Sequence, residues 1–344
     1  MSWKFQNLLW KVLPEDRSVD FTAVIFGTLL ALLMLAFLFG WITRRSRWKR
    51  TAVGAALVMS LSWIVLYATR PPWLRVASMD PVPAPVNHSP IEWRTRAPGL
   101  ETTETDLYVK QTKVDRMVLV RMDPERYELS VRWDPTGTRT AEDWQKELGA
   151  AVVTNGSYFS ESFSPLTPLR ISGEAAGPST YSSTHGALVV RGTSADILDL
   201  REKDALRTIT AYPEAMVSYP LLLDPDGKNR AVDSKTWLAS RNFVGIDRRG
   251  WVVFGATKTG FFTIHRLGEF LKHPALDLRA ALNLDGGPLV GQVVEAGGYS
   301  RRFHGTAEIS RSADSLRVLW HEKSPTNWTL PIVLVATPRE RIGE

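Results

Sequence analysis

The chain is organised around the stretch Ala280-Ala281-Leu282-Asn283-Leu284-Asp285-Gly286-Gly287. A short apolar run that ends at a turn signal is typical of a buried strand. Asp285 ends the run, so its carboxylate should lie at the rim of the fold. The two glycines carry no Cβ atom, which lets the backbone turn sharply and lets a ligand approach the main chain. The stretch therefore predicts a strand that delivers a carboxylate to a site.

An earlier stretch has the same form. Ala150-Ala151-Val152-Val153-Thr154 is followed by Asn155-Gly156-Ser157-Tyr158-Phe159. Again an apolar run leads into a polar residue and a glycine. Two strands that end in this way indicate one shared site.

The residues around these stretches predict mostly strands. Runs rich in β-branched and aromatic residues, bounded by turn residues, are typical of strands. They occur at 107–109, 116–122, 127–133, 186–190, 195–198, 216–219, 221–223, 243–246, 251–254, 315–320 and 331–335. Thr140 and Thr263 are expected to cap two helices, which end near Gly149 and His273. Residues 161–178 predict a long loop.

The first hundred residues predict a membrane anchor. Residues 1–20 have an amphipathic pattern. Two apolar segments, 21–41 and 51–68, are long enough to span a bilayer, and five basic residues lie between them at 44–50. Short basic loops stay cytoplasmic, so the C-terminal part should be extracytoplasmic, on a bacterial inner (cell) membrane. The Pro-rich stretch 69–104 should be a linker, followed by a domain at 105–344.

These elements together predict the fold class and exclude several functions. The fold class is α+β, a strand-rich domain with a few helices, preceded by a two-helix transmembrane hairpin. The net charge is +6, but much of the basic excess lies in the 44–50 loop, so no nucleic-acid partner is expected. The chain has no cysteine, which excludes disulfides, catalytic thiols and thiolate metal sites.

Four motifs resemble the phosphodiester glycosidase family in content and order. They are Asn155-Gly156-Ser157-Tyr158-Phe159, Pro168-Leu169-Arg170-Ile171-Ser172-Gly173, Ser240-Arg241-Asn242-Phe243-Val244-Gly245-Ile246-Asp247 and Leu284-Asp285-Gly286-Gly287. The resemblance covers residues 105 to 337. It implies a hydrolase that cleaves a sugar-1-phosphodiester bond in envelope or exported polysaccharide, with a phosphorylated glycan as its substrate.

Three residues are the main catalytic candidates. Arg241 matches the family's arginine, and a planar guanidinium can meet two phosphate oxygens at once. Asp285 would act as general acid or base, as nucleophile, or as ligand to a divalent cation, which is the one cofactor left open. Asn155 would bind a sugar hydroxyl or orient the Asp285 carboxylate. Glycosidic cleavage usually needs a second carboxylate, and Asp247, Glu161 and Glu174 compete for that role.

Further residues are candidates for substrate binding. Main-chain N–H groups of Gly286 and Gly287 could face phosphate oxygens. A ring of Tyr158 could lie on a sugar face, and His185 or His304 could transfer a proton. The remaining candidates follow from the first motif and are Gly156 and Ser157.

The chain departs from the family pattern at two places. Ser157 stands where relatives often have glycine, and Pro288-Leu289-Val290 follows where a serine is usual. A substrate-holding hydroxyl is therefore absent. This keeps open a non-catalytic glycan- or phosphate-binding module, or a structural component of a polysaccharide assembly system.

Overall fold

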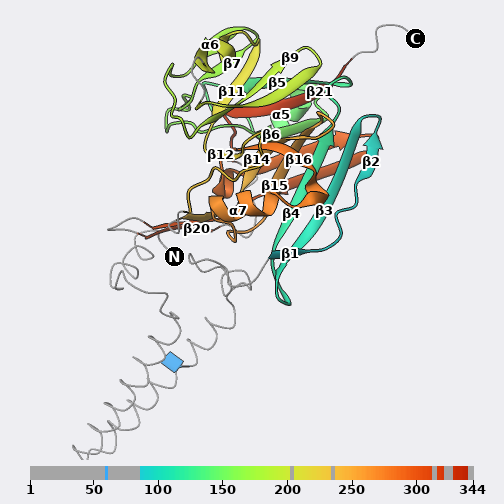
Figure 1. Ribbon diagram of the computed structural model, residues 1–344, viewed down its shortest axis with the longest axis vertical. Coiled ribbons are helices and arrows are strands. Elements are labelled where there is room, and N and C mark those ends of the chain that lie inside the picture. Colours follow the sequence, from blue (N-terminus) through green and yellow to red (C-terminus); the bar gives the residue numbers. More distant parts are fainter. Residues whose placement is uncertain are drawn as a thin grey trace, which may run out of the picture.

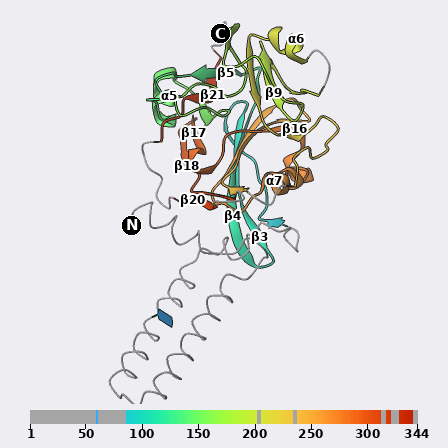
Figure 2. The same ribbon diagram turned by 90° about the vertical axis from the view of Figure 1, so that its left-hand side faces the viewer.

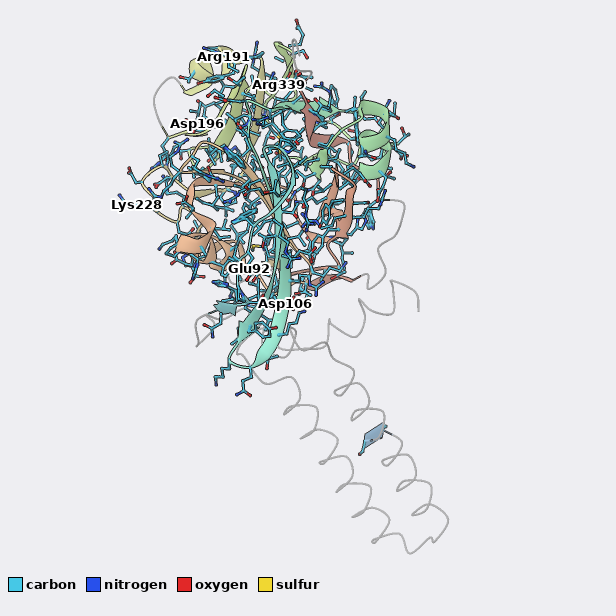
Figure 3. All side chains as sticks on the ribbon, turned by 90° about the vertical axis from the view of Figure 1, so that its right-hand side faces the viewer. Glu92, Asp106, Arg191, Asp196, Lys228 and Arg339 are labelled. Atoms are coloured by element: carbon cyan, nitrogen blue, oxygen red, sulfur yellow. The ribbon has the colours of Figure 1, made fainter. Side chains whose placement is uncertain are left out.

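The computed structural model describes residues 59–60, 86–201, 205–233, 237–311, 316–320 and 328–339. These residues form four sheets, and every strand pairing among them is antiparallel (Figure 1). Helices are few and short. Charged side chains such as those of Glu92, Arg191 and Lys228 project from the outside (Figure 3).

The largest sheet has eight strands in the order β1-β3-β4-β15-β14-β16-β12, with β2 also paired to β3. Their bounds are β1 (Val86–His88), β2 (Arg94–Ala97), β3 (Leu100–Val109), β4 (Thr112–Met122), β12 (Leu221–Leu223), β14 (Asn242–Asp247), β15 (Val252–Thr257) and β16 (Leu278–Asn283). All residues of β14 and β15 are buried, because protein covers both faces of the sheet there. Asp247 Oδ1 accepts N–H bonds from Arg249 and Trp251, which fixes the turn between β14 and β15.

Two five-stranded sheets and one small sheet complete the fold. One has the order β18-β17-β6-β21-β5, the second β10-β9-β11-β7-β8, and the small one β13-β19-β20. Their bounds are β5 (Tyr127–Trp133), β6 (Val152–Asn155), β7 (Leu169–Ile171), β8 (Glu174–Ala176), β9 (Gly186–Arg191), β10 (Ser194–Asp199), β11 (Glu214–Ser218), β13 (Trp237–Ala239), β17 (Gly291–Ala296), β18 (Tyr299–His304), β19 (Ala307–Arg311), β20 (Leu316–Trp320) and β21 (Ile332–Pro338).

The main core lies between the large sheet and the two five-stranded sheets. Phe254 and Leu282 of the large sheet belong to one apolar cluster with Val294 and Leu334 of one five-stranded sheet and Met216 of the other. All five side chains are fully buried. Burying an aliphatic or aromatic side chain of this size contributes about 1.5–3 kcal/mol relative to exposure. This core holds the sheets at fixed positions, and the site described below lies where their strands end.

The helices cover the outer faces of the sheets. They are α5 (Ala141–Leu148), α6 (Ala205–Thr210) and α7 (Ile264–Leu271), with 3-10 turns η1 (Pro274–Leu276) and η2 (Gly287–Leu289). Thr140 caps α5 in a capping box with Asp143, and Gly149 ends it in a left-handed conformation, as predicted. Thr263 caps α7, which ends two residues before the predicted His273. Figure 2 shows α5 and α7 on different sides of the domain.

The predicted two-helix transmembrane hairpin is wrong as part of this fold class. No helix in the described part of the chain is long and apolar enough to cross a membrane. The helices α5 and α7 have 8 residues each, about 12 Å at 1.5 Å per residue, whereas a span needs about 20 residues. The fold class that the structure supports is a strand-rich domain with few helices. The segments 1–20, 21–41 and 51–68 lie outside the described residues, apart from Met59 and Ser60.

Two other predicted boundaries differ from the structure. Within the predicted linker 69–104, residues 86–104 contain β1, β2 and the start of β3. The proline pattern missed them because these strands join the edge of the large sheet through backbone pairing with β3. The predicted loop 161–178 contains β7 and β8, a short hairpin whose first strand pairs with β11.

Candidate active site

The two stretches that the sequence singled out meet in the structure. Asp285 follows the end of β16, and its main-chain N–H donates to the carbonyl of Gly156, just after β6, at 3.0 Å. The Asn155 side-chain amide donates to the carbonyl of Asp285 at 2.8 Å. These bonds join the ends of strands from two different sheets. The predicted shared position of Asn155 and Asp285 is thus present.

The Asn155 side chain is hydrogen-bonded to three separate segments around the site. Its side chain is 2% exposed, and its Oδ1 accepts bonds from Asn242 Nδ2 at 2.8 Å and from the Gly291 N–H at 3.0 Å. Its Nδ2 already donates to Asp285. Because the amide is buried and bonded at both ends, Asn155 positions the Asp285 backbone instead of presenting hydrogen-bond groups to a ligand.

Arg241 lies just before β14 and is almost fully buried. Its Nε donates to the carbonyl of Phe262 at 3.0 Å and its Nη2 to the carbonyl of Trp237 at 2.8 Å. Nη1 donates to none of the described residues, and it lies 3.8 Å from the point where a Cβ on Gly286 would be. Burial lowers the pKa of the Arg241 guanidinium to about 10, so it stays protonated near neutral pH. One nitrogen of a fixed cation therefore faces the Asp285–Gly287 turn.

Glu308 supplies a second carboxylate that the sequence did not reveal. It lies on β19, and its Oε2 is 2.5 Å from the point where a Cβ on Gly287 would be. The negative charge of Glu308 raises the pKa of both Asp285 and Arg241, which places it close to each. No local motif marks Glu308. Glu308 on β19 pairs with Ala239 on β13. Arg241 follows Ala239 by two residues, so this pairing brings Glu308 close to Arg241.

The three carboxylates predicted for the second role lie elsewhere. Asp247 is 1% exposed and forms an ion pair with Arg249 within the β14–β15 turn, at 3.0 Å. Glu161 and Glu174 are exposed residues of the 161–178 segment. Asp247 has a structural role, because it accepts the turn's N–H groups.

The environment of Asp285 changes its proton affinity. The side chain keeps some contact with solvent, but dense protein around it raises the pKa of the carboxyl to about 7. The charge of Glu308 acts in the same direction, whereas a hydrogen bond from the Gly286 N–H to Oδ1, at 2.9 Å, opposes it. A carboxyl with such a pKa can give or take a proton near neutral pH.

Aromatic rings form one wall beside Asp285. The Tyr158 ring stacks on Tyr219, with centroids 4.2 Å apart, and Tyr219 stacks on His185 at 4.8 Å. Tyr158 is buried, and its hydroxyl donates to the Tyr219 carbonyl and accepts from Asn283 Nδ2. Tyr219 is partly exposed, and burial together with Asp285 raises its pKa, which places its ring near the carboxyl. Tyr219, which the sequence analysis missed, is therefore better placed than Tyr158 to meet a ligand.

His185 lies at the end of this stack opposite to Tyr158. Burial lowers the pKa of its imidazole, so the ring is neutral at physiological pH. Its Nδ1 is buried and has no hydrogen-bond partner among the described residues. His185 is thus next to the ring of Tyr219, and it is Tyr219 that lies near Asp285.

The glycines and Ser157 have structural roles. The Gly286 N–H donates to Asp285 Oδ1, and the Gly287 N–H donates to the Ser240 carbonyl at 2.8 Å, so neither faces outward for a phosphate. A Cβ on Gly156 would lie 2.7 Å from the Ile332 side chain. Ser157 Oγ shares a buried hydrogen bond with Thr167 at 2.8 Å, which explains how this departure from the family pattern is accommodated. Within the described residues, no group of three His, Asp or Glu side chains could hold a metal ion.

The contact between Gly287 and Glu308 predicts a specific effect of Gly287→Ala. Gly287 has φ 69°, and Gly298 has φ 78°, so alanine at either position costs about 1 kcal/mol of stability in the left-handed region. A Cβ on Gly287 would displace Glu308, whereas a Cβ on Gly298 meets nothing within 4 Å. Misplacing a catalytic group by about 1 Å can cost about 10²-fold in rate. We expect urea unfolding to shift similarly in both variants and hydrolysis to fall only in Gly287→Ala. Equal activities of Gly287→Ala and Gly298→Ala would contradict a role for Glu308.

Comparison with known families tests the resemblance. Residues 148–315 match the family model described as phosphodiester glycosidase. This part of the chain is similar to phosphodiester glycosidase domains. It contains Asn155, Arg241, Asp285 and Glu308, so the site lies within the matched residues. The resemblance inferred from four motifs is confirmed there.

The similarities to solved structures are distant. The chain is similar to the catalytic domain of zebrafish N-acetylglucosamine-1-phosphodiester alpha-N-acetylglucosaminidase, auto-inhibited by its pro-peptide. The identity is 15% and the TM-score 0.48, over 74% of this chain and 88% of that one. It is also similar to a hypothetical protein from Synechocystis, with 14% identity and a TM-score of 0.45, over 75% of this chain and 65% of that one. No curated protein sequence matches the chain.

Proposed function

We propose that this site hydrolyses the bond between a sugar's anomeric carbon and the phosphate of a phosphodiester. One observation carries the proposal. One nitrogen of the buried Arg241 guanidinium, which has no partner among the described residues, and two carboxyls, those of Asp285 and Glu308, converge on the Asp285–Gly287 turn. The match of residues 148–315 to phosphodiester glycosidases supports this chemistry.

Arg241 is the residue that would bind the phosphate. A phosphodiester carries one negative charge near neutral pH, and a charge-assisted hydrogen bond from a guanidinium is stronger than a neutral one. Backbone carbonyls accept hydrogen bonds from Nε and from one N–H of Nη2. Nη1 donates to none of the described residues, so its two N–H groups are available for a phosphate oxygen. The same carbonyls fix the plane of the guanidinium before the substrate binds, which reduces the entropy lost on binding.

The two carboxyls would have different roles in breaking the glycosidic bond. Asp285, with its raised pKa, donates a proton to the bridging oxygen as the C1–O bond breaks. Glu308 stabilises the positive charge that develops at C1 and accepts a proton from the attacking water. The water oxygen becomes the anomeric hydroxyl, and the products are a free sugar and a phosphomonoester. A later proton exchange with solvent restores both groups.

The pH dependence of the rate tests the role of Asp285. Since its pKa is about 7 and the protonated form is the donor, kcat/KM should fall as pH rises through about 7. The measurement is release of reducing sugar from the methyl ester of N-acetylglucosamine 1-phosphate between pH 5 and 9. A rate that instead rises through pH 7 would assign Asp285 as a base.

The same assay separates the enzyme from its alternatives. Parallel reactions with and without a chelator test the divalent cation that the sequence left open. Phosphodiester binding without turnover under all conditions would favour a glycan- or phosphate-binding module. Neither binding nor turnover would reject both functions.

A further inference from the structure

Ser240 lies immediately before Arg241, between β13 and β14, and its side chain is fully buried. Its N–H, its carbonyl and its hydroxyl all form hydrogen bonds. The N–H donates to the carbonyl of Ala307 at 2.8 Å, and the carbonyl accepts the N–H of Gly287 at 2.8 Å. The hydroxyl donates to the carbonyl of Lys258 at 2.9 Å. Ser240 therefore bonds to three segments from other parts of the sequence.

The hydroxyl of Ser240 also fixes the start of β19, the strand that carries Glu308. Its Oγ accepts the N–H of Thr306 at 3.0 Å and the N–H of Ala307 at 3.2 Å. With the bond to Lys258, the hydroxyl uses its one donor and both acceptor positions. Because Glu308 follows Ala307 directly, these bonds limit how far the Glu308 backbone can move.

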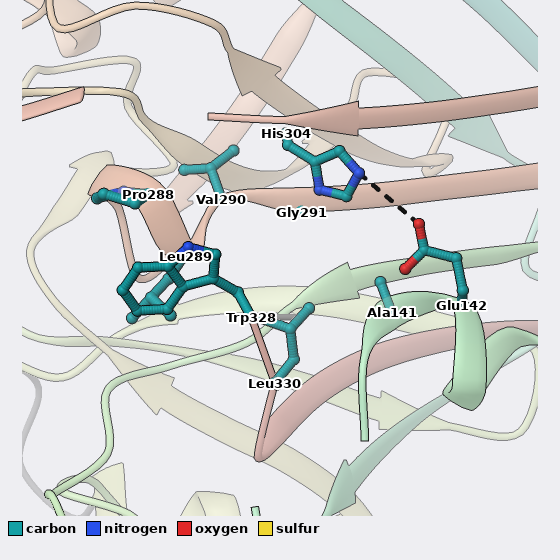
Figure 4. Close-up of a pocket in the computed structure, with 9 residues that line it drawn as sticks. All are labelled: Ala141, Glu142, Pro288, Leu289, Val290, Gly291, His304, Trp328 and Leu330. Atoms are coloured by element: carbon teal, nitrogen blue, oxygen red, sulfur yellow. Dashed lines mark ion pairs between the residues drawn. The ribbon is translucent and has the colours of Figure 1, made fainter. Parts of the chain in front are cut away.

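Ser240 packs where two segments of the site lie side by side. Figure 4 shows Val290 beside His304, and the N–H of the next residue, Gly305, donates to the carbonyl of Val290 at 2.8 Å. A Cβ on Gly305 would lie 2.7 Å from the Cβ of Ser240 and 2.5 Å from the carbonyl oxygen of Gly287. No side chain fits between these groups, so Ser240 lies directly against both segments.

The guanidinium of Arg241 does not depend on the Ser240 hydroxyl. Its Nε and Nη2 donate to two backbone carbonyls, and the main-chain N–H of Arg241 donates to Thr257 Oγ1 at 2.8 Å. Loss of the Ser240 hydroxyl should therefore release Glu308 and leave the phosphate-binding group in place.

We propose that Ser240 is a positioning residue whose hydroxyl keeps the Glu308 carboxylate against the Asp285–Gly287 turn. The inference rests on the proposed function, in which Asp285 and Glu308 act on one glycosidic bond. The carbonyl of Ser240 fixes Gly287, against which Glu308 packs, and its hydroxyl fixes the residue before Glu308. Catalytic groups need a placement within about 0.5 Å, which side chains locked by packing and hydrogen bonds provide. Ser240 thus sets the separation of the two carboxyls.

Kinetics of the full-length protein with the methyl ester of N-acetylglucosamine 1-phosphate test the proposal. Ser240→Ala should lower kcat by about 10- to 100-fold, because a displacement of about 1 Å can cost about 10²-fold in rate. KM should stay within about threefold, since Arg241 keeps its own bonds. The decline in rate should move to lower pH as Glu308 moves away from Asp285. Ser240→Cys, whose thiol is a weaker hydrogen-bond partner, should lie between Ser240→Ala and the wild type.

Thr105→Val is the matched control for the loss of a buried hydroxyl. Thr105 is 1% exposed on β3, and its Oγ1 donates to the carbonyl of Ser89 at 2.8 Å. Thr105→Val should leave kcat, KM and the pH profile unchanged. A fall in kcat equal to that of Ser240→Ala would show a general effect of the lost hydroxyl and would overturn the role of Ser240.

The pKa of Asp285, measured by ¹³C NMR of labelled aspartate carboxyls, tests the positioning without a substrate. The Asp285 signal is the one that Asp285→Asn lacks. Its pKa should fall in Ser240→Ala as in Glu308→Gln and stay unchanged in Thr105→Val. An unchanged pKa in Ser240→Ala would overturn the proposal. If the wild type hydrolyses no phosphodiester, the proposed function fails and this titration alone decides. If Ser240→Ala does not fold, Ser240→Cys replaces it in both measurements.

Discussion

Asp285→Asn should lower kcat/KM for a sugar-1-phosphodiester by about 10³-fold, because amide nitrogen cannot supply the proton that the leaving oxygen needs. The substitution keeps the shape of the side chain, and an Asn Oδ1 can still accept the Gly286 N–H bond. The expected loss is therefore chemical and not structural. Initial rates of sugar release at pH 6 measure it.

The stability of Asp285→Asn should show that the fold is intact. The folded-state pKa of Asp285, about 7, lies above its ordinary value of 3.8. A carboxyl with a raised folded-state pKa stabilises the fold below pH 3.8, and this stabilisation is lost as the pH rises through 7 because the carboxyl ionises. The amide of asparagine stays neutral at every pH. Asp285→Asn should therefore resist urea at least as well as the wild type at pH 8. Asp277→Asn, at an exposed left-handed position that asparagine tolerates, is the control and should keep full activity.

Glu308→Gln should cause a loss of similar size, about 10²- to 10⁴-fold in kcat/KM. A neutral amide can neither stabilise positive charge at C1 nor accept the proton of water. The residual activity should also change its pH dependence. Because the charge of Glu308 raises the pKa of Asp285, its removal should move the decline in rate to lower pH.

A matched control separates charge from position. Glu295→Gln neutralises a carboxylate of β17 that binds Ser300 and Arg302 at the surface, and it should leave both rate and pH profile unchanged. Wild-type activity in Glu308→Gln would remove Glu308 from the mechanism. If the rate of Glu308→Gln is lower but still declines at the same pH as in the wild type, Glu308 does not act electrostatically on Asp285.

Much of the fold was predictable from local sequence patterns. The capping box at Thr140 and Asp143, the left-handed Gly149 and the Asp247–Gly250 turn each depend on residues close in sequence. The strands β5, β14 and β15 were predicted for the same reason, since their apolar patterns are local. The edge strands β1 and β2 were missed because backbone pairing with β3 forms them, and side-chain pattern does not reveal that pairing.

The candidate site was predictable only in part. Asp285, Asn155 and Arg241 stand in motifs, so the sequence indicated them. Their detailed roles depend on contacts between distant segments, such as the bonds that use both ends of the Asn155 amide. Glu308 has no motif at all, and only the pairing of β13 with β19 brings it to Gly287.

The bond that breaks is the most direct test of the mechanism. Hydrolysis in ¹⁸O-labelled water, followed by mass spectrometry of both products, shows which atom the water attacks. Attack at C1, with Asp285 and Glu308 acting on the glycosidic bond, predicts the label in the anomeric hydroxyl of the sugar and none in the phosphomonoester. Label in the phosphate would show cleavage of the P–O bond and would contradict the roles assigned to Asp285, Glu308 and Arg241.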